Sequence, residues 1–264
     1  MPNPPQYTGV VDWDAERYHR LSEPQVAWGR RVLERLDPQP GERVLDVGCG
    51  TGRLTAEVAA RTVRLVIGAD RSATMTAQAR ARRDPRTAFV LADGQALPFG
   101  QAFDAVFSTA TFHWIPDHAR LFAALHGVLK PGGRLVAQCG GGPNLARLLD
   151  RAHALMESPR FKPWFRAWSD PWNFAGVDET RTRLREAGFT SVEVSLEPAP
   201  TTFADALAYA DFISCVCVRH HVDALPAPER APFVATLAEE TAADDPPYTL
   251  DYWRLNIAAV RPAA

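Results

Sequence analysis

Short apolar runs alternate with amphipathic stretches along the first half of the chain. Five runs have the length and composition of buried strands, and the segments between them have helical spacing. The predicted strands are Arg43–Val47, Val63–Ala69, Thr87–Ala92, Phe103–Thr109 and Arg134–Cys139, and the predicted helices are Arg53–Ala60, Ser72–Arg83 and Pro116–Leu129. Strands and helices that alternate in this way form right-handed crossovers and a mostly parallel sheet with both faces covered. The pattern predicts a doubly wound α/β fold.

A further helix is predicted before the first strand, over Ser22–Asp37. Ser22 and Gln25 have the spacing of a capping box, and three apolar residues recur at every fourth position. The apolar residues are Trp28, Val32 and Leu36. In this interpretation Gln25 is only the capping partner of Ser22.

The second half of the chain is patterned differently. Helices are expected at Leu145–Met156 and Asp178–Ala187 and within Phe203–Cys217 and Pro228–Ala243, and two more strands at Ser191–Leu196 and within Thr249–Val260 bring the sheet to seven. Trp164, Trp168 and Trp172 recur every four residues, which indicates an apolar helical face. The expected organisation is 1–140 for the first half of the sheet with its N-terminal helices, 141–176 and 203–246 for a helical cap, and 177–202 and 247–264 for the rest of the sheet.

Composition excludes several classes of function. Lys and Arg number 29 against 31 Asp and Glu, a net charge of −2 that gives no long-range attraction for nucleic acid or an anionic membrane. No apolar run approaches the ~20 residues that span a bilayer, and Met1–Gln6 lacks the pattern of a secretory signal. The four cysteines form no C-x-x-C pair, so neither a metal site nor a disulfide framework is expected. These features favour a cytoplasmic protein, and they leave its oligomeric state open.

A glycine-rich stretch, Val44–Gly52, contains the end of the first strand and a loop that begins at Gly48 and opens the next helix. Its glycines, at 48, 50 and 52, let the chain turn sharply and let a ligand approach the backbone. The spacing departs from the dinucleotide fingerprint G-x-G-x-x-G, because Arg53 stands at the position of the third glycine. Asp46, two residues before the loop, would repel a pyrophosphate and attract an ammonium group. The loop therefore favours a cationic ligand without phosphate.

Carboxylates follow three successive strands. Asp46 precedes the loop, Asp70 ends the second strand and Asp93 follows the third. Asp70 is placed to accept both hydroxyls of a ribose, and Asp93 to accept the exocyclic amine of an adenine. Each aspartate alone is equally a turn or cap residue, but three of them beside a glycine loop favour an adenosine-containing ligand.

The sequence resembles the class I S-adenosylmethionine-dependent methyltransferases. The resemblance is carried by VLDVGCGTG (44–52), Asp70, ADGQALPF (92–99), FDAVFSTATFHWI (103–115) and LKPGGRLV (129–136), and it covers about residues 13–140. It implies a Rossmann-like sheet with a helical cap, S-adenosyl-L-methionine as cofactor and a small-molecule acceptor. It also implies a role for each matching residue: Asp46, Gly48 and Gly50 at the methionine end, Asp70 at the ribose, Asp93 and Gly94 at the adenine with Arg71 stacked on it, Thr109 beside the sulfonium and Tyr18 closing over the cofactor.

The acceptor side resembles a subgroup that methylates small carboxylic acids, such as the trans-aconitate and juvenile hormone acid methyltransferases. The segment Trp13–Tyr18, Gln25 and the pair His113-Trp114 carry this resemblance. It implies that Gln25 and Trp114 donate hydrogen bonds to the acceptor carboxylate. The aconitate type has an arginine at the position of Gln25, and this departure argues against a tricarboxylate acceptor.

Other functions remain open at this point. Trp114 has a second interpretation, as a core or cap residue. His113 either packs among aromatic residues or acts as a general base for a phenolic or carbon nucleophile. A non-catalytic protein that binds S-adenosylmethionine or its demethylated product is a further possibility. A dinucleotide-dependent oxidoreductase is disfavoured by Arg53 and Asp46.

Overall fold

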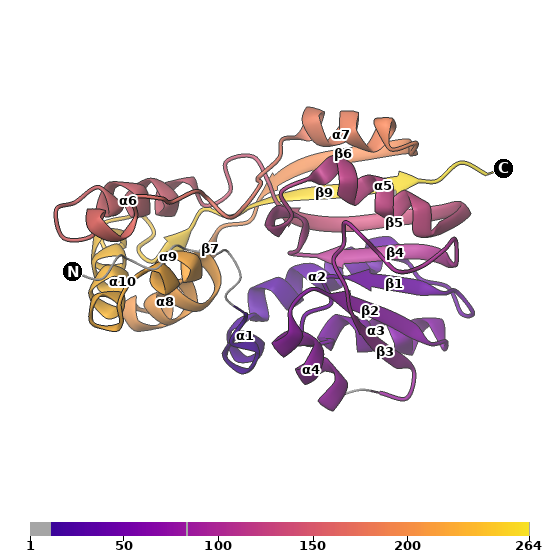
Figure 1. Cartoon of the computed structure of the whole chain (residues 1–264), viewed down its shortest axis with the longest axis horizontal. Helices are drawn as coiled ribbons and strands as arrows, with labels where there is room; N and C mark the ends of the chain where they lie inside the picture. Colours follow the sequence, from indigo (N-terminus) through magenta and orange to yellow (C-terminus); the bar gives the residue numbers. More distant parts are fainter. Residues whose placement is uncertain (1–11, 83, 264) are drawn as a thin grey trace. The chain divides into compact units, whose positions relative to one another are not determined.

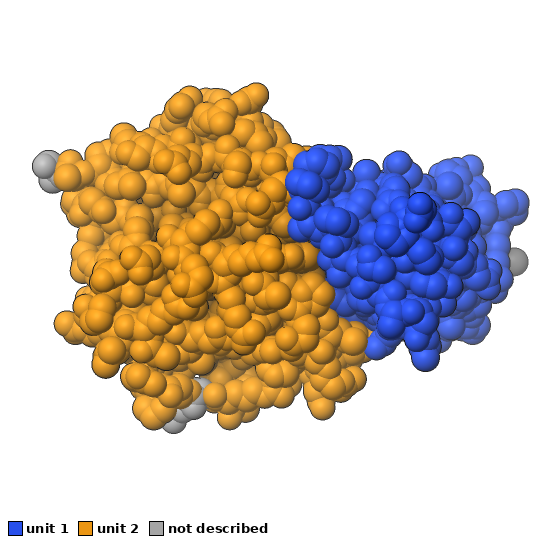
Figure 2. All heavy atoms as spheres, turned by 180° about the vertical axis from the view of Figure 1, so that it is seen from behind, with its two compact units in different colours: residues 1–11, 143–171, 198–253 blue, residues 12–142, 172–197, 254–264 orange. Residues whose placement is uncertain are grey.

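The computed structural model describes residues 12–82 and 84–263 of the chain. The stretch Met1–Gln6 and Arg83, both used in the sequence predictions, lie outside these residues. The described part forms two compact units (Figure 2). The larger lies within residues 12–142, 172–197 and 254–263, and the smaller within residues 143–171 and 198–253.

The larger unit is built on a seven-stranded sheet. Its strands lie in the order β3-β2-β1-β4-β5-β9-β6 (Figure 1). Their bounds are β1 Val44–Val47, β2 Val66–Asp70, β3 Thr87–Leu91, β4 Phe103–Thr109, β5 Leu129–Gly140, β6 Thr190–Pro198 and β9 Trp253–Val260. The first five strands pair in parallel, and β9 runs antiparallel to β5. The predicted doubly wound, mostly parallel fold is confirmed.

Helices cover both faces of this sheet. On one face, α2 (Glu23–Leu36) and α3 (Arg53–Thr62) pack on β1, β2, β4 and β5, and on the other α5 (His118–Val128) and α7 (Val177–Glu186) do so. The short strand β1 contributes apolar side chains to both faces. Val44 packs in the apolar cluster with α2 and α3, and Leu45 and Val47 pack in the cluster on the opposite face, with α5 and α7. Asp46 points to the same face as Val44, because side chains alternate along a strand. The remaining helices of this unit, α4 (Ala73–Ala81) and α1 (Ala15–Leu21), contact each other, and α4 packs on β2 and β3.

The smaller unit is mainly helical. It contains α6 (Ala146–Met156), α8 (Ala206–Phe212), a π-helical turn (Ile213–Cys217), α9 (Arg219–Ala224), α10 (Ala227–Thr241) and the two-stranded pair β7 (Thr201–Thr202) and β8 (Thr249–Leu250). Its core contains aromatic rings in mutual contact, among them Phe161, Phe165 and His221 around Phe233. Arg151 of α6 pairs with Asp244 at 2.6 Å, just beyond α10.

Two local predictions were wrong, and two short helices were missed. The tryptophan-rich stretch is not a helix, since only Lys162–Trp164 forms a single 3-10 turn and Pro171 disfavours helix at the residues next to it. The predicted capping box does not form: within the described chain the Ser22 side chain caps no backbone amide, and the Ser22 N–H donates instead to the Tyr18 carbonyl. The helices α1 and α9 were not predicted, because seven and six residues are too few to show an apolar period.

The helices of the described chain are short. The α10 helix has 15 residues, including an internal proline. Across residues 12–82 and 84–263, no helix is long and apolar enough to cross a membrane. The acidic, histidine and cysteine side chains of these same residues form no group of three or more that could hold a metal ion.

Candidate active site

The glycine loop leaves the end of β1 in a conformation that side chains disfavour. Gly48, Gly50 and Gly52 have φ angles of +75°, +52° and +79°. A Cβ on Gly48 would lie 2.0 Å from Oγ1 of Thr111, so this glycine is required by space as well as by backbone angle. Around the position of a Cβ on Gly50, by contrast, no described atom lies within 4 Å beyond its chain neighbours. The loop is therefore packed at Gly48 and open at Gly50.

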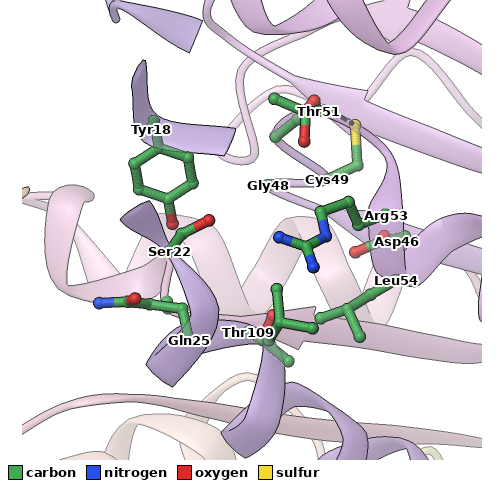
Figure 3. A pocket seen from close by; sticks show the side chains of 13 residues that line it. Tyr18, Ser22, Gln25, Asp46, Gly48, Cys49, Thr51, Arg53, Leu54 and Thr109 are labelled. Carbon is green, nitrogen blue, oxygen red and sulfur yellow. Dashed lines mark hydrogen bonds between the residues drawn. The ribbon is translucent and has the colours of Figure 1, made fainter. Parts of the chain in front are cut away.

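A pocket of about 450 Å³ lies against this loop, within the larger unit. Figure 3 shows Tyr18, Ser22 and Gln25 on one side and Asp46, Cys49 and Arg53 on the other. The remaining lining residues are Val26, Gly48, Gly50, Thr51, Leu54, Thr109 and Ala110. Six of the residues singled out from the sequence thus line one pocket: Tyr18, Gln25, Asp46, Gly48, Gly50 and Thr109.

Asp46 is a buried carboxyl group in this pocket wall. Its side chain is 2% exposed, and Thr55 Oγ1 donates a hydrogen bond to Oδ2 over 2.6 Å. Burial raises the pKa of Asp46 to about 7, the Thr55 hydrogen bond acts in the opposite direction, and the charge of Asp70 adds to the rise. A cation beside this carboxyl group would restore its ionised form. The site is therefore suited to an ammonium group.

Asp70 is oriented by two backbone amides. Gly50 N–H donates to Oδ2 over 2.9 Å and Ser72 N–H to Oδ1 over 2.8 Å. Burial raises the pKa of Asp70, and these two hydrogen bonds lower it. Each carboxylate oxygen has two lone pairs, so each can still accept one hydroxyl. Asp70 is thus fixed in an orientation compatible with a ribose diol.

The residues predicted at the adenine do not line this pocket. Asp93 is exposed and accepts a hydrogen bond from Gln95 N–H over 2.9 Å, and Arg71 is also exposed. Gly94 is buried, and a Cβ there would lie 3.2 Å from Ile115. Ala92, next to Asp93, donates its N–H to the Asp70 carbonyl over 2.9 Å. Asp70 in turn accepts a hydrogen bond from Gly50 of the pocket wall.

The segment around α1 supplies contacts that the sequence did not reveal. His19 Nδ1 lies 2.8 Å from Thr51 Oγ1 of the glycine loop. Arg53 donates to the His19 carbonyl over 3.1 Å and pairs with Glu23 at 2.6 Å. Asp14 caps α1 by accepting from Arg17 N–H, which is the signal by which this helix could have been found. Together these contacts hold α1 against the loop.

Gln25 is a buried amide in the same wall. Its side chain is 8% exposed, and its Oε1 has no hydrogen-bond partner among the described residues. A buried polar atom without a partner is costly unless a ligand or water satisfies it. The Gln25 Oε1 atom is thus open to a contact with a ligand or water, and the capping bond with Ser22 does not form.

Aromatic rings extend from this pocket to the pair His113-Trp114. Tyr18 and Trp13 lie 5.2 Å apart in edge-to-face contact, and Trp13 and Trp114 lie 5.5 Å apart. Trp114 in turn contacts Trp172 at 6.1 Å. Trp114 lies outside the residues that line the pocket and is joined to it by Trp13 and Tyr18.

His113 is also outside the lining residues, and it is held in place on several sides. Gly140 N–H donates to its Nδ1 over 3.2 Å, and its ring stacks on Phe174 at 5.6 Å. Burial and the charges of Arg254 and His118 lower its pKa well below the usual value. His113 is thus a neutral imidazole whose Nδ1 is already an acceptor.

Comparison with known proteins agrees with this geometry. A methyltransferase domain family matches residues 45–137. Trans-aconitate 2-methyltransferase of Methylobacterium radiotolerans is 33% identical over 235 residues, covering 85% of this chain and 87% of the relative. The enzyme of the same name from Rhodopseudomonas palustris is 29% identical, covering 96% and 100%. This chain is a class I S-adenosylmethionine-dependent methyltransferase. It belongs to the subgroup that includes the trans-aconitate 2-methyltransferases.

Solved structures of similar fold are more distant. Haemonchus contortus phosphoethanolamine N-methyltransferase 2, in complex with S-adenosyl-L-methionine, has a TM-score of 0.63 at 22% identity, covering 97% of this methyltransferase and 58% of that chain. The cyclase SpnF has a TM-score of 0.59 at 22% identity, covering 90% and 81%. These likenesses support the fold alone, and a cyclase among them shows that the fold does not determine the reaction.

The cofactor of this methyltransferase is S-adenosylmethionine, and the described residues fit it. The group carries an ammonium, a ribose and a cationic sulfonium, and it has no phosphate. The buried carboxyl group of Asp46, the oriented carboxylate of Asp70 and the open space at Gly50 match these features. The predicted cofactor is confirmed.

Proposed function

We propose that this methyltransferase forms methyl esters on a carboxylate of a small-molecule acceptor. S-adenosylmethionine supplies a methyl group on a cationic sulfonium, so the protein must hold an oxygen nucleophile close and aligned. A carboxylate is already ionised at neutral pH and needs no general base, whereas a phenol does.

The state of His113 carries this proposal. A general base works best with a pKa near the operating pH, but burial drives the pKa of His113 far below it. Its Nδ1 also accepts the Gly140 N–H. His113 is thus poorly suited to remove a proton, which favours a nucleophile that carries none. The names of the curated relatives, trans-aconitate 2-methyltransferases, point to the same acceptor chemistry.

Gln25 and Trp114 are the proposed donors to the reacting carboxylate. Gln25 lines the pocket on the side across from Asp46 (Figure 3), and either end of its amide can be turned toward a ligand. Trp114 contributes an indole N–H, a donor only. Neutral donors orient a carboxylate while leaving it more nucleophilic than an ion pair would.

The test combines product chemistry with a pH profile. With a labelled methyl donor and a panel of carboxylic acids, the product should be a base-labile ester that releases methanol on hydrolysis. At saturating cofactor, kcat should be nearly constant from pH 6 to 8.5. Gln25→Ala and Trp114→Phe should each lower kcat/KM for the acid about 10- to 100-fold, with S-adenosylhomocysteine affinity nearly unchanged. A base-stable product, or a kcat that falls as the pH drops from 8.5 to 6, would assign the enzyme to a phenolic or carbon nucleophile. Wild-type turnover by both variants would remove these residues from the mechanism.

A further inference from the structure

The chain re-enters the larger unit after residue 171 and there contacts the proposed acceptor residues. Residues 172–174, the clamp segment, contact the 3-10 turn Phe112–Trp114 both on its backbone and on two of its rings. This turn carries His113 and Trp114. The clamp segment therefore contributes to how these two side chains are presented.

The start of the turn is held from the pocket wall and from α5. Thr111, the residue before the turn, places Oγ1 3.3 Å from the Gly48 carbonyl and 2.9 Å from the Thr109 carbonyl. Gly48 and Thr109 both line the pocket. His118 Nε2 lies 2.9 Å from the Phe112 carbonyl, and because a carbonyl only accepts, this nitrogen is the donor. These contacts fix the start of the turn and leave its far end to other groups.

Asn173 donates two hydrogen bonds at this far end. Its backbone N–H donates to the His113 carbonyl over 2.8 Å, and its side-chain Nδ2 donates to the Pro116 carbonyl over 3.0 Å. The two carbonyls belong to residues on either side of Trp114 and Ile115 in the chain. Because both acceptors are carbonyls, the amide nitrogen of Asn173 must face Pro116. One residue thus spans the peptide groups that set the backbone of Trp114.

The neighbours of Asn173 contact the side chains of the turn. Trp172 meets the Trp114 ring edge-to-face with centroids 6.1 Å apart, and Phe174 stacks on the His113 ring at 5.6 Å. The two rings of the clamp segment also stack on each other, with centroids 5.8 Å apart and planes 21° apart. The Trp114 side chain is therefore oriented by ring contact as well as by its backbone.

We propose that Asn173 is a positioning residue of this methyltransferase, which keeps the Trp114 indole in the orientation from which its N–H binds the acceptor carboxylate. This inference rests on the donor role proposed for Trp114. An indole has a single N–H donor, so its contribution to binding depends on the orientation of the ring. Asn173 itself is outside the pocket-lining residues, so its effect passes through the turn.

The kinetic test is a double-mutant cycle on the full chain. Asn173→Ala removes the side-chain bond and keeps the backbone bond. It should lower kcat/KM for the acid that wild type esterifies fastest about 3- to 10-fold, with S-adenosylhomocysteine affinity within about twofold. Asn173→Asp has the same shape, places an oxygen against the Pro116 carbonyl and should be at least as severe. In a Trp114→Phe background, Asn173→Ala should change kcat/KM by less than about twofold, because the positioned donor is already absent. Gln39→Ala is the matched control, since Gln39 Nε2 likewise donates to a surface carbonyl, that of Asp37, over 2.8 Å.

Fluorine NMR reports on Trp114 without turnover. The chain has seven tryptophans, and after labelling with 5-fluorotryptophan the Trp114 resonance is the one that is absent from Trp114→Phe. In the S-adenosylhomocysteine complex, Asn173→Ala should shift or broaden this resonance, and Gln39→Ala should leave it unchanged. The resonance of Trp28, assigned in the same way, is the internal reference.

The two readouts separate this inference from the proposed function. If wild type forms no ester with any acid, the proposed function is refuted, and a Trp114 resonance that moves in Asn173→Ala still supports the positioning role. An unchanged Trp114 resonance, a loss of turnover that adds fully to that of Trp114→Phe, or equal losses in Asn173→Ala and Gln39→Ala would overturn the inference. Thermal melting shows whether each variant folds, and Asn173→Asp takes the place of Asn173→Ala in the cycle if the alanine variant does not.

Discussion

Cofactor binding should release a proton at mildly acidic pH, and Asp46 is the source. In the protein alone, burial holds the pKa of this carboxyl group at about 7. An ammonium group beside it favours the ionised form, so binding to the protonated protein must expel the proton. With a pKa near 7, the release should be about nine-tenths of a proton at pH 6 and about one-tenth at pH 8. The affinity should rise about tenfold over the same interval.

The assay is isothermal titration calorimetry with S-adenosylhomocysteine, which has the same ammonium group. Titrations at pH 6 and pH 8, each in buffers of different ionisation enthalpy, give the number of protons released. Thr55→Val removes the hydrogen bond that stabilises the Asp46 carboxylate. The pKa of Asp46 should then rise further, and the release should persist to higher pH.

Two controls isolate Asp46 from the other titrating groups. 5′-Methylthioadenosine lacks the ammonium-bearing portion and should bind without proton release. Asp46→Asn keeps an acceptor for Thr55, cannot titrate and should lose both the release and the pH dependence of affinity. An Asp46→Asn variant that releases as many protons as wild type would refute the reasoning, and so would wild-type binding without buffer dependence at pH 6.

Three further predictions test the loop, the core and the smaller unit. Gly48→Ala should weaken cofactor binding at least about tenfold in calorimetry, because the new Cβ would meet Thr111 and the φ of +75° disfavours alanine; unchanged binding would contradict the assigned loop geometry. Phe122→Ala should lower the free energy of unfolding by roughly 3–5 kcal/mol in urea, since the ring is fully buried. His221 has a pKa of about 3 in the fold against 6.5 normally, so its share of stability is complete above pH 6.5 and is lost as the pH falls toward 3. His221→Phe should therefore flatten the loss of stability across that window in pH-dependent urea denaturation, and an unchanged slope would show that His221 does not titrate on unfolding.

The strands of the sheet could be predicted because their signals are local. Phe103–Thr109 was predicted with the bounds that β4 has in the structure, since a continuous apolar run of this length between turn residues defines a buried strand. The helix predicted to reach Leu129 ends one residue earlier, at Val128. The strand after it starts at Leu129 rather than Arg134, with a shift of register between β4 and β5 there. A prediction from apolar runs alone does not detect such a bulge.

The grouping of the proposed cofactor residues could be predicted for a similar reason. Asp46, Gly48 and Gly50 are close in sequence, and Asp70 follows at the next strand end, where the parallel fold brings it to the loop. The surroundings of the proposed acceptor residues depend on contacts between distant segments. The state of His113 is determined by Gly140 and Phe174, and neither contact has a local signal.

The α2 helix forms part of the pocket wall, and this affects how variants are interpreted. Gln25 lines the pocket, and one turn later Trp28 lies against the Arg254 guanidinium in a cation–π contact. A substitution that shifts α2 should therefore alter the affinity for S-adenosylhomocysteine and the turnover of the acceptor together. A substitution that acts through the Gln25 amide alone should change turnover while S-adenosylhomocysteine binds as before. Measuring both quantities for Trp28→Phe, which keeps an aromatic face against the guanidinium, shows whether a change at this contact displaces the helix.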